Sequence, residues 1–211
     1  MCAGVPGEAA GATFTACHRG DFNSDTRGRL TIEARDYKPG VKQVIKVKLE
    51  HPDQSRWGFQ LTIRLASNPL QGVGTFTAVA GAIRVVCSAG AGVARPCPEG
   101  QNEFATHLAP TTYAGQRNGG EWEIAWTPPA EAVGDLIIYA AGNAANSAGG
   151  NSGDIIYNVN RTIGVENCQL PKPAISAVRN AASFLDGPLS LNTLIAIGGT
   201  GLQAAGTTRN V

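Results

Sequence analysis

Residues 41–49 read VKQVIKVKL, and their alternation decides the class of the fold. Ile45, Val47 and Leu49 fall on one side of an extended chain, while the lysines between them fall on the other. This follows because successive side chains of a strand point to opposite faces. The stretch therefore predicts a β-strand with one buried face.

The next segment repeats this pattern after a turn at residues 51–54, HPDQ. From Phe59 to Leu65 every odd position is apolar, which places these side chains inward. The even positions, which include Thr62 and Arg64, are then expected to face solvent. Two alternating segments joined by a short polar turn predict a β-hairpin.

Clusters rich in Gly, Pro and Asn separate five more stretches of strand character. In one of them Trp122, Ile124 and Trp126 fall on the same side, which predicts that both tryptophans lie in the core. Seven short strands predict an all-β fold, an immunoglobulin-like antiparallel β-sandwich with a short C-terminal β-rich extension. The five additional strands are expected at residues 29–33, 81–87, 121–127, 135–141 and 153–163.

The composition excludes several classes of protein. Only 16% of the 211 residues are charged and the net charge is +1, so we expect no nucleic-acid partner. No apolar run reaches the roughly 18 residues of a membrane span. The first residues, MCAGVPGE, lack the features of a signal peptide, and we expect a signal to have been removed. Five cysteines favour an oxidising compartment, outside the cell or at its surface.

A short Pro-rich stretch divides the chain. Residues 168–173, CQLPKP, have the stiffness of a linker, because each proline holds the backbone extended and removes a hydrogen-bond donor. We therefore expect a sandwich over residues 1–167 and a second unit over residues 174–211. The second unit is too short to bury a core of its own. It is expected to be a partial β domain that docks, or that associates or exchanges with another copy of the chain.

Two of the five cysteines flank a loop of small residues. Cys87 and Cys97 enclose residues 88–96, and a local disulfide there would replace packing that Gly and Ala side chains cannot provide. The other cysteines share one further bridge and one free thiol, and the sequence leaves their pairing open. They are Cys2, Cys17 and Cys168.

A polar run near the N-terminus has the spacing of a calcium loop. Asp21, Asn23 and Asp25 would offer three oxygen ligands on alternating residues. The usual glycine after the third ligand is Thr26 here, and the usual bidentate glutamate is Ile32. A solvated polar loop is therefore the favoured interpretation, with calcium as the alternative.

A second polar loop, residues 142–154, holds four side chains suited to a sugar or an ion: Asn143, Asn146, Asn151 and Asp154. Asn and Gly are also the usual residues of long hairpin loops, which is the other interpretation. Trp57 begins a strand beside Gly58, and in an exposed position it would suit glycan stacking or a protein contact.

No motif typical of catalysis is evident in the sequence. A phosphate-binding loop, a zinc-type Cys/His cluster and paired carboxylates with catalytic spacing are all missing. We therefore expect that this protein is not an enzyme.

Five stretches carry a family resemblance: YKPG at 37–40, WGFQL at 57–61, TH at 106–107, WEIAWTPP at 122–129 and IYAAGNAAN at 138–146. In this order they resemble the reelin N-terminal (Reeler) domain and its bacterial relatives, often called choice-of-anchor domains. The resemblance covers roughly Gly4 to Val165. It implies an immunoglobulin-like sandwich in an exported protein, usually an adhesion, recognition or cofactor-holding module.

The resemblance also implies a competing disulfide. Animal Reeler domains tie an N-terminal cysteine to one that precedes the Thr-His landmark. In this chain that bond would join Cys17 to Cys87 or Cys97.

Bacterial members of the family commonly carry Gly-x-Pro-Gly-Glu followed by Cys-x-x-Cys-His, the attachment signature of c-type haem. This chain has GVPGE at 4–8 and the pair Cys17-His18, but Phe14 stands at the first cysteine of the motif. The resemblance implies, as an alternative to a disulfide, a haem held through Cys17 with His18 as the proximal ligand. His107 would be its second axial ligand.

The C-terminal residues, VRNAASF at 178–184 and LIAIGGTGL at 194–202, resemble the opening of a β-rich domain of acidobacterial exported proteins. The sequence as a whole predicts a secreted bacterial module, binding or structural, that acts through loops and sheet edges on an extracellular protein or glycan. The favoured expectation is that it holds no cofactor, with haem c or calcium as alternatives. With haem it would be an electron-transfer module.

Overall fold

A computed structural model describes residues 3–5, 22–88, 97–98, 100–148, 150, 152–166 and 174–200. The chain divides into two compact units, residues 1–166 and residues 167–211. Each unit is described by itself below. No helix in the described ranges is long and apolar enough to cross a membrane.

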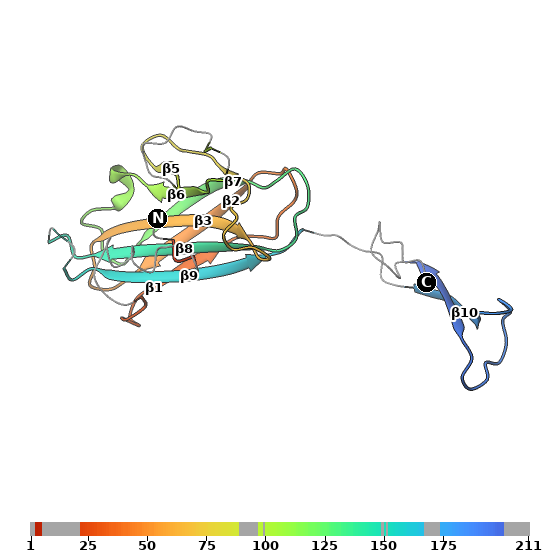
Figure 1. The fold of residues 1–211 in the computed structure, drawn as a ribbon. Coiled ribbons are helices and arrows are strands. Elements are labelled where there is room, and N and C mark those ends of the chain that lie inside the picture. Colours follow the sequence, from red (N-terminus) through yellow and green to blue (C-terminus); the bar gives the residue numbers. More distant parts are fainter. Residues whose placement is uncertain are drawn as a thin grey trace. The chain divides into compact units, whose positions relative to one another are not determined.

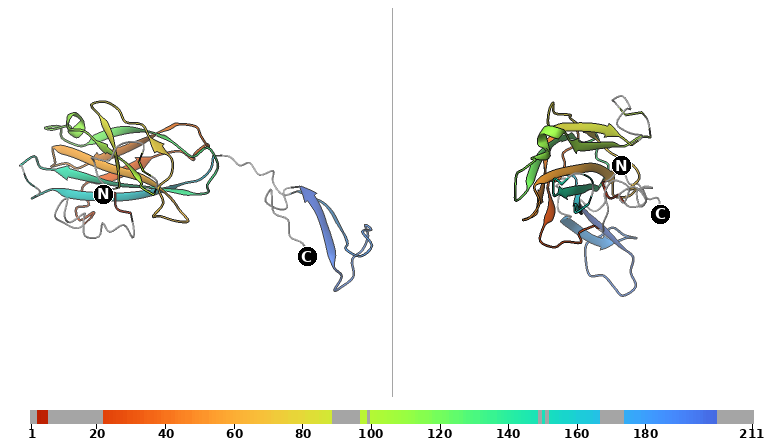
Figure 2. Two further views of the ribbon diagram at one scale, coloured as in Figure 1. Left: turned by 45° about the horizontal axis from the view of Figure 1, so that its top comes forward. Right: turned by 90° about the vertical axis from the view of Figure 1, so that its left-hand side faces the viewer.

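The first unit is an antiparallel β-sandwich, as the alternating segments predicted (Figure 1). One sheet has the order β1-β2-β7-β4, formed by Arg29–Glu33, Gln43–Glu50, Gly120–Thr127 and Thr75–Phe76. The other has the order β5-β6-β3-β8-β9, formed by Ile83–Cys87, Glu103–His107, Arg56–Leu65, Leu136–Ala145 and Ile155–Ile163. A 3-10 turn, Ala109–Thr112, precedes β7. Figure 2 shows the sandwich from two further directions.

The core lies between the two sheets and is built from the alternating positions of their strands. In β2 and β7 the register places Ile45 opposite Ile124 and Val47 opposite Trp122. All four side chains are buried, and Trp126 is fully buried beside them. The predicted inward face of β2 and the predicted core role of both tryptophans are therefore confirmed.

The predicted hairpin of β2 and β3 is wrong. β2 pairs with β1 and β7, whereas β3 pairs with β6 and β8 in the other sheet. The turn after β2 therefore carries the chain from one layer to the other. The physical reason is that both strands have an apolar face, and the two faces bury each other across the core rather than side by side in one sheet.

The outer face of β3 is not exposed to solvent, contrary to the prediction for Thr62 and Arg64. Both residues are fully buried. The Arg64 guanidinium lies 5.1 Å from the centre of the Phe104 ring and donates to the carbonyl of Leu70. Phe104 belongs to a small apolar cluster on this face of the sheet, formed by Ala3, Val5, Val86, Phe104 and Tyr139. The N-terminal residues thus help to cover a second side of the five-stranded sheet.

Trp57 is buried in the core, which overturns the suggestion that it is an exposed platform. Its indole Nε1 donates to the carbonyl oxygen of Gln116 at 2.9 Å. The side chain therefore contributes to packing and anchors a loop, and it offers no surface for glycan stacking.

The second unit contains two paired strands. β10 (Ala174–Asn180) and β11 (Ile195–Thr200) form an antiparallel two-stranded sheet with a bulge between Ile175 and Ala177. Arg179 and Asp186 form an ion pair at 2.9 Å. The side chain of Asn180 accepts hydrogen bonds from the amides of Ala182 and Ser183, which begins the connection between the strands.

Candidate functional site

One end of the sandwich, called the loop end here, brings the described residues of the predicted calcium loop, Asn23 and Asp25, to the same end as Asn146 of the predicted ligand loop. β3 begins and β8 ends at this end, since Arg56 pairs with Ala145, and β9 also begins here. The loop end consists of residues 22–28, 51–55 and 113–119 and the described part of 146–153.

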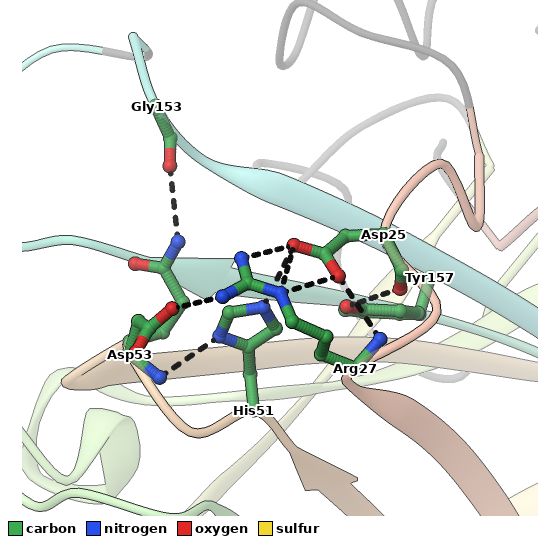
Figure 3. A network of polar contacts seen from close by, with 7 residues as sticks. Asp25, Arg27, His51, Asp53, Gly153 and Tyr157 are labelled. Atoms are coloured by element: carbon green, nitrogen blue, oxygen red, sulfur yellow. Dashed lines mark hydrogen bonds and ion pairs between the residues drawn. The ribbon is translucent and has the colours of Figure 1, made fainter.

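A polar network joins the first two of these segments (Figure 3). Arg27 contacts two carboxylates: its Nη2 lies 2.6 Å from Oδ2 of Asp25, and its Nη1 contacts Asp53. The carboxylate of Asp25 also accepts the backbone N–H of Arg27 at 2.9 Å. Hydrogen bonds from the Arg27 side chain, then from its backbone N–H and from His51, hold the pKa of Asp25 well below its ordinary value.

His51 fixes the centre of this network. Its side chain is completely buried, Nδ1 accepts the backbone N–H of Asp53 at 3.1 Å, and Nε2 lies 3.2 Å from Oδ2 of Asp25. Because Nδ1 is an acceptor, the ring proton lies on Nε2 and is donated to Asp25. The imidazole therefore orients the β2–β3 turn and the N-terminal segment relative to each other.

Two further hydrogen bonds attach β9 and the β8–β9 loop to this network. The hydroxyl of Tyr157 donates to the carbonyl of Asp25 at 2.9 Å. Gln54, which follows the turn, donates from Nε2 to the carbonyl of Gly153 at 3.1 Å. Three segments that are distant in the sequence are thus tied together by side chains.

Asn23 pairs with the edge of β9. Its backbone N–H donates to Ile156, and its side-chain amide exchanges hydrogen bonds with Asn158. Asn23 and Asp25 therefore have protein partners in this structure, while Asp21 lies outside the described residues. Within the described ranges no three His, Cys, Asp or Glu side chains gather as a metal site. Calcium binding stays a prediction.

The predicted ligand loop is held by its own polar side chains. Asn143 donates to Asp154 at 3.1 Å, and Asn146 donates to the carbonyl of Ser152 at 3.0 Å. The side-chain oxygen Oδ1 of Asn146 accepts the backbone N–H of Ala148, which closes the turn. Asn151 lies outside the described residues. These contacts support the interpretation as a hairpin loop, and ligand binding by these residues stays a prediction.

His107 packs against the first residues of β3. Its Nδ1 lies 3.0 Å from the backbone nitrogen of Phe59 and 3.1 Å from the carbonyl oxygen of the same residue, and that carbonyl also accepts the hydroxyl of Thr106 at 2.8 Å. A Cβ on Gly58 would lie 2.5 Å from Cε1 of His107, so only glycine leaves room for the ring. Burial lowers the pKa of His107, and the nearby charges of Arg84 and Arg56 lower it further, against the raising effect of the Phe59 hydrogen bond.

The haem prediction rests on residues that the structure describes only in part. Cys17 and His18 lie outside the described residues, as does Phe14. His107 is half-buried, with Nδ1 hydrogen-bonded to the backbone. The haem site therefore stays a prediction.

Residues 113–119 form a further loop at the loop end, where the sequence indicated only a turn. It is anchored from below by the Trp57 bond to Gln116, and the amide of Gly115 donates to Ser55 at 2.8 Å. Asn118 has a left-handed backbone with φ of 72°. A shallow depression of about 280 Å³ lies beside the loop, lined by Lys48, Gln116, Arg117, Asn118, Gly119, Gly120 and Glu121.

No family model matches the sequence, and no curated protein matches it. Among solved structures, the human F-spondin Reeler domain (fragment 2) is 18% identical and has a TM-score of 0.39, covering 66% of this chain and 93% of that chain. The Reelin-N domain of F-spondin is also 18% identical, with a TM-score of 0.42, and covers 76% of this chain and 100% of that chain. The fold resembles that of Reeler domains.

Cohesins are similar as well. The seventh ScaB type I cohesin of Pseudobacteroides cellulosolvens is 14% identical, with a TM-score of 0.38, and covers 66% of this chain and 92% of that chain. A likeness of this degree, to Reeler domains or to cohesins, concerns the fold alone.

The sandwich contains the predicted local disulfide, Cys87–Cys97. This bond excludes the competing pairing of Cys17 with either residue. Cys2, Cys17 and Cys168 lie outside the described residues, so their pairing stays open.

Proposed function

We propose that this chain is a non-catalytic extracellular binding module that contacts a glycan or protein partner through the loop end of the sandwich. The observation that carries the proposal is the set of side-chain bonds that fix the loops there. Asp25, Arg27 and His51 join two segments, and Trp57 and Gln54 anchor two others. A surface whose loops are already held loses little conformational entropy on binding.

The exposed groups at this end include several polar and charged side chains beside one large apolar side chain, Phe22, which is 39% exposed. Arg27 and Asp53 are 59% and 62% exposed, and Arg117 and Asn118 project from the 113–119 loop. Guanidinium and amide groups around a shallow depression can hydrogen-bond hydroxyl, carbonyl and carboxylate groups. These are the groups that a sugar or a peptide loop presents, which supports a glycan or protein partner over an apolar small molecule.

The extracellular setting is supported by the Cys87–Cys97 disulfide, because such bonds persist in oxidising compartments. The non-catalytic role is supported by the hydrogen bonds that the imidazoles of His51 and His107 already make within the protein. Both ring nitrogens of His51 are engaged within the network, and Nδ1 of His107 is bonded to the backbone. Neither geometry is that of a base beside a nucleophile.

The test is a binding screen of the full chain against immobilised glycans and extracellular-matrix proteins. A charge reversal at the loop end, Arg117→Glu, is compared with Arg35→Glu, which lies in a second shallow depression at the opposite end of the sandwich. We expect Arg117→Glu to weaken each hit at least ten-fold and Arg35→Glu to leave it unchanged. Hits lost only in Arg35→Glu would place the binding surface elsewhere.

Haem c is the cofactor alternative to this proposal, with Cys17, His18 and His107 as the residues that would hold it. When bound, the group would supply one-electron chemistry. Expression in a host that attaches haem, followed by absorbance of the purified full chain, distinguishes the two. A binding module without haem has no Soret band, whereas a band that disappears in Cys17→Ala supports the alternative.

A further inference from the structure

The loop over residues 113–119 presents backbone donors that have no acceptor in the protein. Among the described residues, none accepts a hydrogen bond from the backbone N–H of Arg117, Asn118 or Gly119. Gly119 is a buried residue, and a buried N–H without an acceptor is rare in folded proteins. Three consecutive donors of this kind indicate a ligand that accepts hydrogen bonds at this loop.

The backbone of the loop turns these donors toward one side. Asn118 is left-handed with φ of 72°, and it directly follows Arg117, whose φ is negative. Such a change of sign between consecutive residues makes neighbouring N–H groups converge on a concavity that accepts an anion. The loop is held in this form from within, because Gln116 donates from Nε2 to the carbonyl of Gly119 at 2.7 Å and its own carbonyl accepts Nε1 of Trp57.

The charges beside the loop leave Arg117 as a cation in excess. Glu50 lies 2.8 Å from the ammonium of Lys48, and Glu121 lies 3.7 Å from that of Lys46, so both carboxylates already have cationic partners. The exposed guanidinium of Arg117 forms no ion pair with any described residue. A carboxylate on a ligand would supply the missing partner, since guanidinium and carboxylate match in geometry and charge.

The lining of the depression indicates what carries this carboxylate. The depression measures about 280 Å³, and no large apolar side chain lines it. A protein partner usually anchors itself through an aromatic or aliphatic side chain in an apolar pocket, which is not offered here. The amide of Asn118 lines the same depression and suits the hydroxyl groups of a sugar. These features favour a sugar acid over an acidic segment of a protein.

We propose that the depression beside residues 113–119 binds the carboxylate of a uronic acid, with the guanidinium of Arg117 and the N–H groups of residues 117–119 as its donors. The inference rests on the proposed function of the loop end, and it narrows the partner to a carboxylated glycan.

The test is an NMR titration of the isotope-labelled full chain with trigalacturonic acid and, in parallel, with its methyl ester. The ester keeps the sugar rings and hydroxyl groups but has no carboxylate charge. We expect the acid to shift the amide signals of residues 117–119. The ester should bind at least ten-fold more weakly, because charge-assisted hydrogen bonds are roughly twice as strong as neutral ones.

A matched pair of variants assigns the binding to the loop. Arg117→Gln removes the guanidinium and should weaken binding of the acid at least ten-fold. Arg35→Gln removes an equally exposed guanidinium from the other depression and should leave binding unchanged. Tryptophan emission of each variant shows that the sandwich stays folded, since all three tryptophans lie in its core.

Four results would overturn the inference: equal affinity for the acid and its ester, no shift of residues 117–119 at millimolar acid, binding that Arg117→Gln leaves intact, or tighter binding of a tetraglutamate peptide than of the acid. The last result would assign the donors to a protein partner. None of these results decides the proposed function itself, which fails only if the hits of the binding screen depend on Arg35 and not on Arg117.

Discussion

Nε2 of His51 lies 3.2 Å from Oδ2 of Asp25, although 26 residues and one whole strand pair separate them in the chain. The bond links the segment before β1 to the turn after β2. Because the ring is completely buried, the contact is also shielded from competing water. The loop end is thus organised by a contact between two segments that are distant in the sequence and that flank the paired strands β1 and β2.

Replacing Asp25 by Asn is expected to lower the thermal midpoint of the sandwich by a few degrees at pH 7. Asn keeps the size of the side chain but removes the charge that Arg27 and His51 contact. Thermal unfolding followed by tryptophan fluorescence measures the effect. Glu131→Gln, in an exposed loop at the opposite end, is the control and should leave the midpoint unchanged.

The difference in thermal midpoint between the parent chain and Asp25→Asn should depend on pH in a definite direction. The folded-state pKa of Asp25 is lowered from its ordinary value of 3.8, so its carboxylate stabilises the fold above that pH. This contribution is lost as the pH falls through the folded-state pKa. The difference in midpoint between the parent and Asp25→Asn should therefore be full at pH 7 and shrink below about pH 4. A difference that grows on acidification would contradict the assignment.

Gly58→Ala is expected to destabilise the sandwich by about 1–2 kcal/mol, because the new Cβ would lie 2.5 Å from the imidazole of His107. The double variant Gly58→Ala/His107→Ala removes the obstacle. In a double-mutant cycle by urea unfolding, the alanine at 58 should cost much less in the His107→Ala background. Equal costs in both backgrounds would show that the ring does not limit position 58.

The Cys87–Cys97 disulfide closes a short loop of sequence separation 10. Replacing both cysteines by serine should lower the free energy of unfolding by about 2–3 kcal/mol, chiefly through the greater freedom of the unfolded chain. Urea unfolding of the double variant beside the oxidised parent measures this. Reduction of the parent should reproduce the loss, and a parent that is insensitive to reduction would speak against the bond.

The alternation of residues 41–49 was sufficient to predict the sandwich, but not the partners of its strands. A period of two shows that a strand has a buried face, and it does not show which sheet the strand joins. β2 and β3 were therefore expected to pair, whereas they lie in opposite layers. β6 was missed because Glu103–His107 is short and its inward residue is Ala105.

The candidate site was predictable only in outline. Asn23 and Asp25 were singled out as polar loop residues, but their partners Asn158 and His51 are distant in the sequence. The sequence of the 113–119 loop indicated only a turn. Its attachment could not be predicted, because the side chain that holds it is Trp57, which lies in β3. Only the tertiary structure brings these side chains to one end of the sandwich.

Hydrogen–deuterium exchange of the full chain, with and without the glycan or matrix protein found in the binding screen, tests the central claim most directly. The partner should slow exchange in residues 22–28, 51–55 and 113–119, which form the loop end. Residues 34–42, 66–74 and 128–135, at the opposite end, should exchange at unchanged rates. Protection confined to the opposite end, or to the outer faces of the sheets, would contradict binding through the loop end.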